Sequence, residues 1–99
     1  MTIPAEILKL WEQYSTEAFP KVDREIDGVN LSLLDTEIAG CIHMFIHNSG
    51  RLDYQRVMAL REHLIDLNVI ILFLDTDEFN YFNRLRELAN LILQEAENN

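Results

Sequence analysis

Cysteine, proline and glycine are all scarce in this sequence of 99 residues. The single cysteine excludes a disulfide within the chain, as is usual in a reducing compartment. Only two prolines and three glycines are present, so long uninterrupted helices are permitted. The longest apolar run, residues 69–74, is much shorter than the ~20 residues that cross a bilayer. The N-terminal residues also lack the pattern of a signal peptide, so we expect a cytoplasmic protein that does not enter a membrane.

Basic side chains are few as well. Eight lysines and arginines oppose 17 aspartates and glutamates, which gives a net charge of −9. Nucleic acid and anionic membranes repel such a chain, so neither is an expected partner. Acidity of this degree keeps a small protein soluble, and this is the interpretation we favour. A mimic of nucleic acid that fills a basic cleft is the weaker alternative, because the acids are spread along the chain.

Hydrophobic residues, by contrast, make up 48% of the chain. A chain of this length buries roughly 60–65% of its unfolded surface, which is sufficient for a modest core. The sequence contains no internal repeat, low-complexity segment or linker. We therefore expect a single helical domain over residues 1–99.

The first predicted helix opens the chain. Thr2 is a suitable cap, and Pro4 would lie in the first turn, where its missing amide hydrogen is harmless. The spacing predicts an amphipathic helix that ends near residues 19–20. Its apolar face comprises Ile3, Ile7, Leu10, Trp11, Tyr14 and Ala18.

The segment at about residues 20–34 is either a loop or a short β-ribbon. Its Asp27-Gly28 pair is typical of a two-residue hairpin turn. Because an isolated ribbon is only marginally stable, we favour a packed loop. The expected anchors are Ile26, Val29 and Leu31.

Two further helices are predicted in the middle of the chain. Asp35 is a good cap for the second helix, which runs to about Asn48 and closes near Gly50. Asp53 caps the third helix, which begins one residue later. By composition residues 69–74 also suit a strand, but the helical spacing continues through them, so we expect helix. The third helix turns Val57, Leu60, Leu64, Leu67 and Ile71 toward the core.

The fourth predicted helix begins at Asp75, where D-T-D-E is typical of a capping box between Asp75 and Glu78. Its buried face comprises Phe82, Leu85, Leu88, Ala89, Ile92 and Ala96. Four amphipathic segments with mostly short connections predict an all-α, antiparallel four-helix bundle.

The second helix carries the residues with the richest chemistry. On a helical wheel Cys41 faces the core, where a thiol is inert. His43 and His47 lie on the opposite side, four residues apart, which is the spacing of two imidazole ligands of one metal ion. A third ligand is supplied only if His63 or Glu37 approaches. We therefore expect surface or interface histidines and no cofactor, with divalent-metal binding as the alternative.

Two surfaces are predicted to contact another helix or another chain. Thr36 and Gly40 are small residues on the histidine side of the second helix, where a neighbouring helix could approach closely. Val69, Ile70 and Phe73 make the third helix apolar on a side that is polar earlier, which is typical of burial on two sides. Either the first helix or a second subunit would cover these apolar side chains. We favour a symmetric homodimer, with docking on a different protein as the related possibility.

Recognised catalytic motifs are missing from the sequence. It has no dinucleotide-binding glycine pattern, P-loop or G-x-S-x-G, and no paired E-x-x-H of di-iron bundles. The carboxylate pattern of helical nucleotide pyrophosphatases is missing too. We therefore expect a non-catalytic protein that self-associates or docks on a partner. The alternative is a metal- or small-ligand-binding bundle that uses His43 and His47.

The run GVNLSLLDTEIAGC at residues 28–41, followed by GRLD at 50–53, resembles a pattern in small uncharacterised bacterial proteins of about this length. The run F-x-R-L-x-x-L-A at residues 82–89 belongs to the same resemblance. That group has no assigned activity. The resemblance therefore implies a compact bacterial domain and assigns no site residues.

Overall fold

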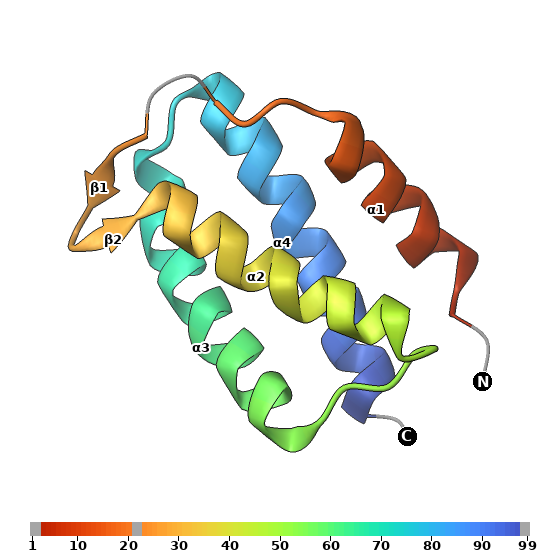
Figure 1. Ribbon diagram of the computed structural model, residues 1–99. Helices are drawn as coiled ribbons and strands as arrows, with labels where there is room; N and C mark the ends of the chain where they lie inside the picture. The colour runs from red at the N-terminus through yellow and green to blue at the C-terminus, as the bar shows by residue number, and fades with distance from the viewer. Residues whose placement is uncertain (1–2, 21–22, 98–99) are drawn as a thin grey trace.

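The computed structural model describes residues 3–20 and 23–97, which fold as an all-α four-helix bundle with one small ribbon (Figure 1). The helices are α1 (Ala5–Thr16), α2 (Leu31–His47), α3 (Tyr54–Ile70) and α4 (Thr76–Glu97). Successive helices run in opposite directions, and α4 packs against each of the other three (Figure 1). The fold class predicted from the sequence is therefore confirmed. None of the helices in the described part of the chain is long and apolar enough to cross a membrane.

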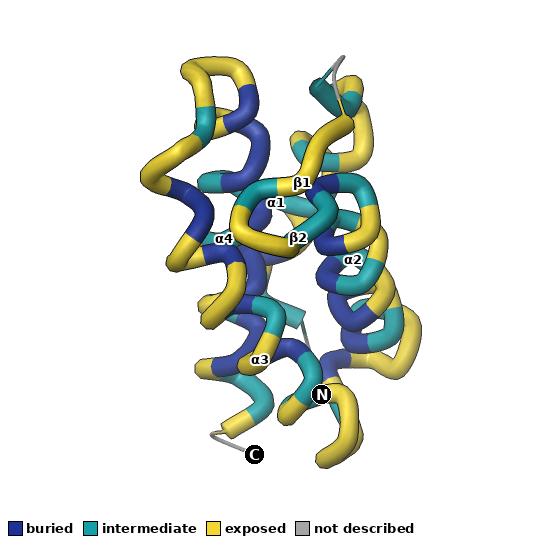
Figure 2. The backbone as a smooth tube through the Cα atoms, turned by 90° about the vertical axis from the view of Figure 1, so that its left-hand side faces the viewer, coloured by how far each residue is buried: buried dark blue, intermediate teal, exposed yellow. Residues whose placement is uncertain are grey.

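The core lies between α4 and the other helices, and the buried parts of the helices face one another there (Figure 2). The buried hydrophobic residues of α4 are Tyr81, Phe82, Leu85, Leu88, Ala89, Ile92 and Leu93. Helix α1 contributes the fully buried Ile7, and its remaining core contacts come from partly buried side chains. Ala18 and Ala96, which are predicted on apolar faces, do not pack on the core, since Ala18 is exposed and Ala96 is half-buried. With Ile7 as its one fully buried side chain, α1 is the most peripheral of the four helices.

Helix α1 is shorter than the sequence predicts. Pro4 precedes it at the cap position, with an extended ψ of 138°, instead of lying in the first turn. The helix ends at Thr16 because Glu17 is extended. The Thr16 hydroxyl donates to the carbonyl of Gln13 at 3.1 Å, which satisfies an acceptor that a longer helix would use. The predicted cap Thr2 lies outside the described residues.

The connection between α1 and α2 contains a short ribbon, so the preference for a loop is wrong. Strand β1 (Glu25–Ile26) pairs antiparallel with β2 (Val29–Asn30). Asp27 and Gly28 form the turn with φ angles of 52° and 80°. Two successive positive φ angles match the twist of the flanking strands, and an Asp-Gly pair adopts them readily. The predicted anchors stabilise the ribbon by packing on the core: Ile26, Val29 and Leu31.

Helix α2 begins at Leu31, ahead of the predicted cap Asp35. The side chain of Asn30 accepts a hydrogen bond from a first-turn amide at 2.9 Å, and Asp23 accepts one from another at 3.0 Å. These two acceptors satisfy amides that have no partner within the helix, so the helix starts directly out of β2. Asp35 is consequently an internal helix residue. The predicted closing turn is found, with φ of 91° at Gly50.

The caps predicted for α3 and α4 are confirmed. Asp53 accepts a hydrogen bond from an amide of the first turn of α3 at 2.8 Å. Asp75 and Glu78 form the reciprocal capping box, in which each carboxylate accepts from the other residue's amide, at 2.8 and 2.9 Å. Residues 69–74 form no strand. Helix α3 passes there into the 3₁₀ turn η1 (Ile71–Phe73), so the helical prediction for this run holds in outline.

Candidate functional site

His43 and His47 lie on the exposed side of α2, as the sequence predicts. Their rings stack with centroids 5.8 Å apart, and the His43 ring also lies 6.4 Å from that of Trp11 on α1. His63 is engaged elsewhere, because its Nε2 lies 3.0 Å from a Glu37 carboxylate oxygen. Among the described residues, no group of three or more His, Cys, Asp or Glu side chains is placed to hold a metal ion. A tetrahedral metal site uses four ligands, and the stacked pair would account for two of them.

Cys41 is buried in the core, and burial raises the pKa of its thiol. Its Sγ donates to the carbonyl of Arg56 at 3.9 Å, a weak contact, so this cysteine acts as a small packing residue. Thr36 and Gly40 lie on the exposed side of α2. A Cβ added at Gly40 would meet no described atom within 4 Å, so no helix of the described chain packs closely there. Contact of this strip with another chain stays a prediction.

The most extensive apolar exposure among the described residues runs along α3. We define the α3 ridge as the exposed apolar side chains of α3 and η1: Tyr54, Met58, Ile65, Val69, Leu72 and Phe73. Met58, Ile65 and Leu72 recur every seven residues and therefore form one line along the helix. Leu72 is 85% exposed and Ile65 is 63% exposed. The opposite side of α3 faces the core, so this helix is apolar on two sides.

Sequence reasoning found only part of the α3 ridge. Val69 and Phe73, predicted to contact another helix or another chain, are left exposed by the described chain, but Ile70, which was predicted with them, is fully buried. Successive side chains of an α-helix point about 100° apart. Ile70, one residue after the exposed Val69, therefore points to the core side of α3, which also carries Leu67. The seven-residue repeat was the signal that could have identified the missed members: Met58, Ile65 and Leu72.

Charged side chains border the α3 ridge unevenly. By helical spacing Glu62 and Asp66 lie on one flank, and both are exposed. Neither makes a hydrogen bond or ion pair with a described residue. On the other flank Arg61 forms an ion pair with Glu97 of α4. The uncompensated charge beside the ridge is therefore negative.

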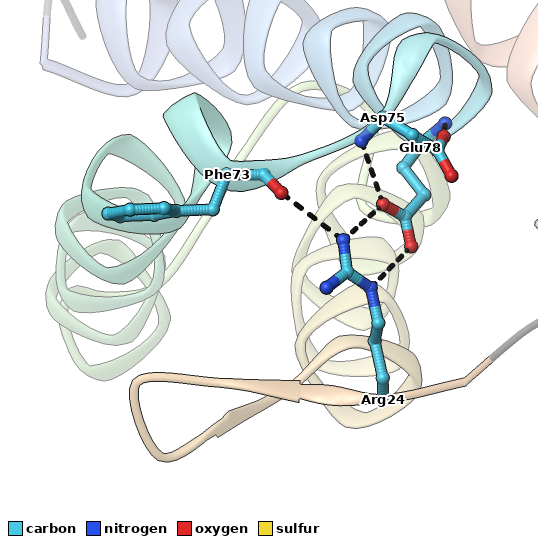
Figure 3. Close-up of polar contacts among 4 residues, drawn as sticks. All are labelled: Arg24, Phe73, Asp75 and Glu78. Atoms are coloured by element: carbon cyan, nitrogen blue, oxygen red, sulfur yellow. Dashed lines mark hydrogen bonds and ion pairs between the residues drawn. The ribbon is translucent and has the colours of Figure 1, made fainter.

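The end of the α3 ridge at Phe73 is held by Arg24, which precedes the ribbon (Figure 3). The Arg24 guanidinium donates to the Phe73 carbonyl at 3.2 Å and to the two oxygens of Glu78 at 2.7 and 2.9 Å. Glu78 is 4% exposed, and the hydrogen bonds from Arg24 lower the pKa of its carboxyl group. Figure 3 shows that the Phe73 ring points away from this cluster. Arg24 therefore fixes the backbone beneath the ridge while the ring stays exposed.

A second polar cluster joins α1, α2 and α4. The hydroxyls of Tyr14 and Tyr81 donate to the same Asp35 oxygen, at 2.5 and 2.9 Å. Burial raises the pKa of the Asp35 carboxyl group, and the two tyrosine hydrogen bonds oppose that rise. Burial also raises the pKa of both tyrosines. Since these three groups bind one another, the cluster fastens α1 to the bundle.

An open hollow of about 490 Å³ lies between the end of α1 and the start of α4. Most of its carboxylates are engaged within the chain. Glu17 pairs with Arg84, while Asp75 and Glu78 form the capping box of α4. Tyr81 contributes to the wall, but its hydroxyl is already bound to a carboxylate. The residues that line this hollow do not pair a nucleophile with a base.

No family model, no curated protein and no solved structure gives a significant match to this chain. The resemblance to small bacterial proteins therefore stays a prediction. Among the candidate sites, the α3 ridge carries most of the large apolar side chains that the rest of the described chain leaves exposed.

Proposed function

We propose that this chain is a non-catalytic helical domain that docks on another protein through the α3 ridge. The observation that carries the proposal is the exposed apolar row on a helix whose opposite side is already in the core. A surface helix of a single bundle normally turns one apolar stripe inward and a polar face outward. A second apolar side is typical of a helix that is covered on both sides.

The extent of the α3 ridge supports this proposal. Tyr54 is 76% exposed and Phe73 is 63% exposed. Aromatic side chains bury about 150–250 Å² each, so these two alone expose on the order of 300 Å². The aliphatic members of the ridge add to this area. This much exposed apolar area along a single helix is typical of a surface that serves an interaction.

The local structure prepares the α3 ridge for docking. Arg24 holds the backbone of Phe73 in place, and the ridge residues that precede η1 lie on the regular helix α3. A surface that is ordered before binding loses little conformational freedom when a partner arrives. This favours a preformed docking surface over one that must fold first.

The buried polar groups support a structural role for the bundle interior. The carboxylate of Asp35 is bound to two tyrosines, and that of Glu78 is bound to Arg24 and to the start of α4. Cys41 packs in the core. Catalytic groups are usually directed at a cleft, whereas these groups are directed at one another. In keeping with the single buried cysteine, we propose the cytoplasm as the compartment.

Site-specific photo-crosslinking in the encoding organism tests the proposal. A photoreactive residue at Leu72 or Ile65 should give a discrete crosslinked product whose partner is identified by mass spectrometry. The same residue at Leu8, which is exposed on α1, should not give that product. The product at Leu72 should disappear when Ile65→Ser is added. No discrete product at either ridge position, under conditions where the protein is folded, would refute the proposal.

The alternative function is metal or small-ligand binding, and one observation favours it. The rings of His43 and His47 are stacked with an interplanar angle of only 13°, so both imidazoles are already directed to the same side of α2. The remaining ligands would come from solvent or from another chain. Elemental analysis of the purified protein that finds stoichiometric zinc, copper or iron, lost in the double alanine variant, would support this alternative.

A further inference from the structure

The α3 ridge also indicates which kind of chain would dock on it, an inference that rests on the proposed function. We propose that the occupant is an amphipathic helix of another protein, with a row of apolar side chains bordered by lysine or arginine. The shape of the ridge, the charge beside it and the net charge of the chain each favour this occupant.

The shape of the α3 ridge suits a helix laid alongside it. Met58, Ile65 and Leu72 lie seven residues apart, so the line is about 21 Å long at a rise of about 1.5 Å per residue. An amphipathic helix presents the same repeat on one face and packs along such a line at about 8–10 Å between axes. Exposure rises from 39% at Met58 to 85% at Leu72, so the deepest contact is expected toward η1.

The charge beside the α3 ridge selects a basic helix. Glu62 follows Met58 by one turn, and Asp66 follows Glu62 by one turn, so both carboxylates border the apolar line. Both are exposed and free of partners among the described residues. A helix on the ridge would bring its flanking side chains beside them. Lysine or arginine there gains charge-assisted hydrogen bonds, whereas glutamate or aspartate is repelled.

A second copy of this chain is a poorer occupant. Antiparallel symmetric packing of α3 on α3 would place the flank with Glu62 beside the same flank of the other copy, and parallel packing would place it beside Arg61, which already pairs with Glu97. Either arrangement removes water from a carboxylate without supplying a positive side chain that is free of another partner. Each copy also carries a net charge of −9, so two copies repel one another at long range. A basic helix is attracted by the same charge.

The probe is a synthetic helical peptide of about three heptads, with leucine along one face and lysine on the flanks. One matched peptide has glutamate in place of lysine, and another has alanine in place of leucine. Binding to the full chain is measured by fluorescence anisotropy over a range of salt concentrations, and the bound surface is mapped by amide chemical shifts. We expect both matched peptides to bind at least about tenfold more weakly than the Leu/Lys peptide, with shifts confined to α3 and η1.

Variants then separate the α3 ridge from general attraction to an acidic protein. Ile65→Ser removes a central apolar anchor and should weaken the Leu/Lys peptide about tenfold. Leu8→Ser is the matched control, because Leu8 is 44% exposed on α1, and it should leave binding unchanged. The pair Glu62→Gln and Asp66→Asn should weaken binding and reduce its salt dependence. These positions are exposed, so circular dichroism should show that each variant stays folded.

Three outcomes would overturn the inference. The first is equal weakening by Ile65→Ser and Leu8→Ser, and the second is equal binding of the lysine and glutamate peptides. The third is a light-scattering mass of twice 11.6 kDa without peptide that Ile65→Ser reduces to one copy. That result would make a second copy the occupant, so the α3 ridge would still be the docking surface but its partner would be this same chain. Failure of the crosslinking test would instead refute the proposed function itself.

Discussion

Replacing Asp35 tests whether one carboxylate fastens α1 to the rest of the bundle. The Asp35 carboxylate, on α2, accepts hydrogen bonds from Tyr14 of α1 and Tyr81 of α4. Helix α1 otherwise contributes a single fully buried side chain, Ile7. The perturbations are Asp35→Ala, which removes the acceptor, and Asp35→Asn, which keeps an acceptor oxygen and removes the charge.

The expected cost of Asp35→Ala follows from the groups that it leaves unpaired. Tyr81 is 5% exposed, so its hydroxyl loses its acceptor without gaining water, at about 1–3 kcal/mol. Tyr14 is half-buried and regains some water, so it adds less. The higher helix propensity of alanine offsets about 0.5 kcal/mol of this loss in unfolding free energy. The net loss of about 1–3 kcal/mol corresponds to a drop in Tm of about 4–24 °C for a domain of this size.

Asp35→Asn should behave differently, and its effect should depend on pH. Burial raises the pKa of the Asp35 carboxyl group in the folded chain above its ordinary value. The folded state therefore binds this proton more tightly than the unfolded state does. The resulting stability is complete below the unfolded pKa of about 3.9 and is lost as pH rises through the folded pKa. Wild type should thus gain stability relative to Asp35→Asn as the pH falls from 7 to 4.

The assay is urea and thermal unfolding followed by circular dichroism between pH 4 and pH 8. Asp66→Ala serves as the control, because Asp66 is exposed on α3 and should tolerate the change. At pH 7 we expect Asp35→Asn to lie within about 1 kcal/mol of wild type, since both tyrosines keep an acceptor. Equal destabilisation by asparagine and alanine, or none by alanine, would refute the reasoning.

Three further predictions concern other parts of the chain. Arg24→Met should lower the urea midpoint more at pH 7 than below pH 4. Arg24 lowers the pKa of Glu78, so their pairing contributes stability above the unfolded pKa of about 4.3. That stability is lost as the pH falls through the folded pKa. Gly28→Ala should cost about 1–2 kcal/mol of unfolding free energy in chemical denaturation, because φ is 80° there while the space around it is open. Alanine at both His43 and His47 should leave the Tm in a calorimetric scan unchanged, since both are exposed, and a clear fall would show that the stacked pair is structural.

Local hydrogen bonding explains why the starts of α3 and α4 were predicted correctly and that of α2 was not. The Asp53 carboxylate caps α3 by accepting from an amide three residues later, and Asp75 and Glu78 cap α4 over the same span. Such contacts depend only on neighbouring residues, so a sequence pattern identifies them. The start of α2 depends on two competing acceptors, Asn30 and the later Asp35. The ribbon favours Asn30, because pairing of β1 with β2 places the Asn30 side chain at the first turn of α2.

The α3 ridge shows the same limit at a surface. The apolar spacing of α3 identified a core face and indicated that its end was apolar on more sides than one. Which residues stay exposed depends on the rotation of α3 against α2 and α4, which the spacing leaves open. Ile70 consequently turned out to be buried, while Met58 and Leu72 joined the ridge.

By itself the sequence determined the four amphipathic helices and the caps of α3 and α4, because each follows from residues within a turn or two. The tertiary structure decided the polar clusters, because their partners are distant in the chain. Tyr14 and Tyr81 lie 21 and 46 residues from Asp35, and Arg24 lies 54 residues from Glu78. It also decided that no described element of the chain covers the α3 ridge, since coverage depends on how all the helices pack together.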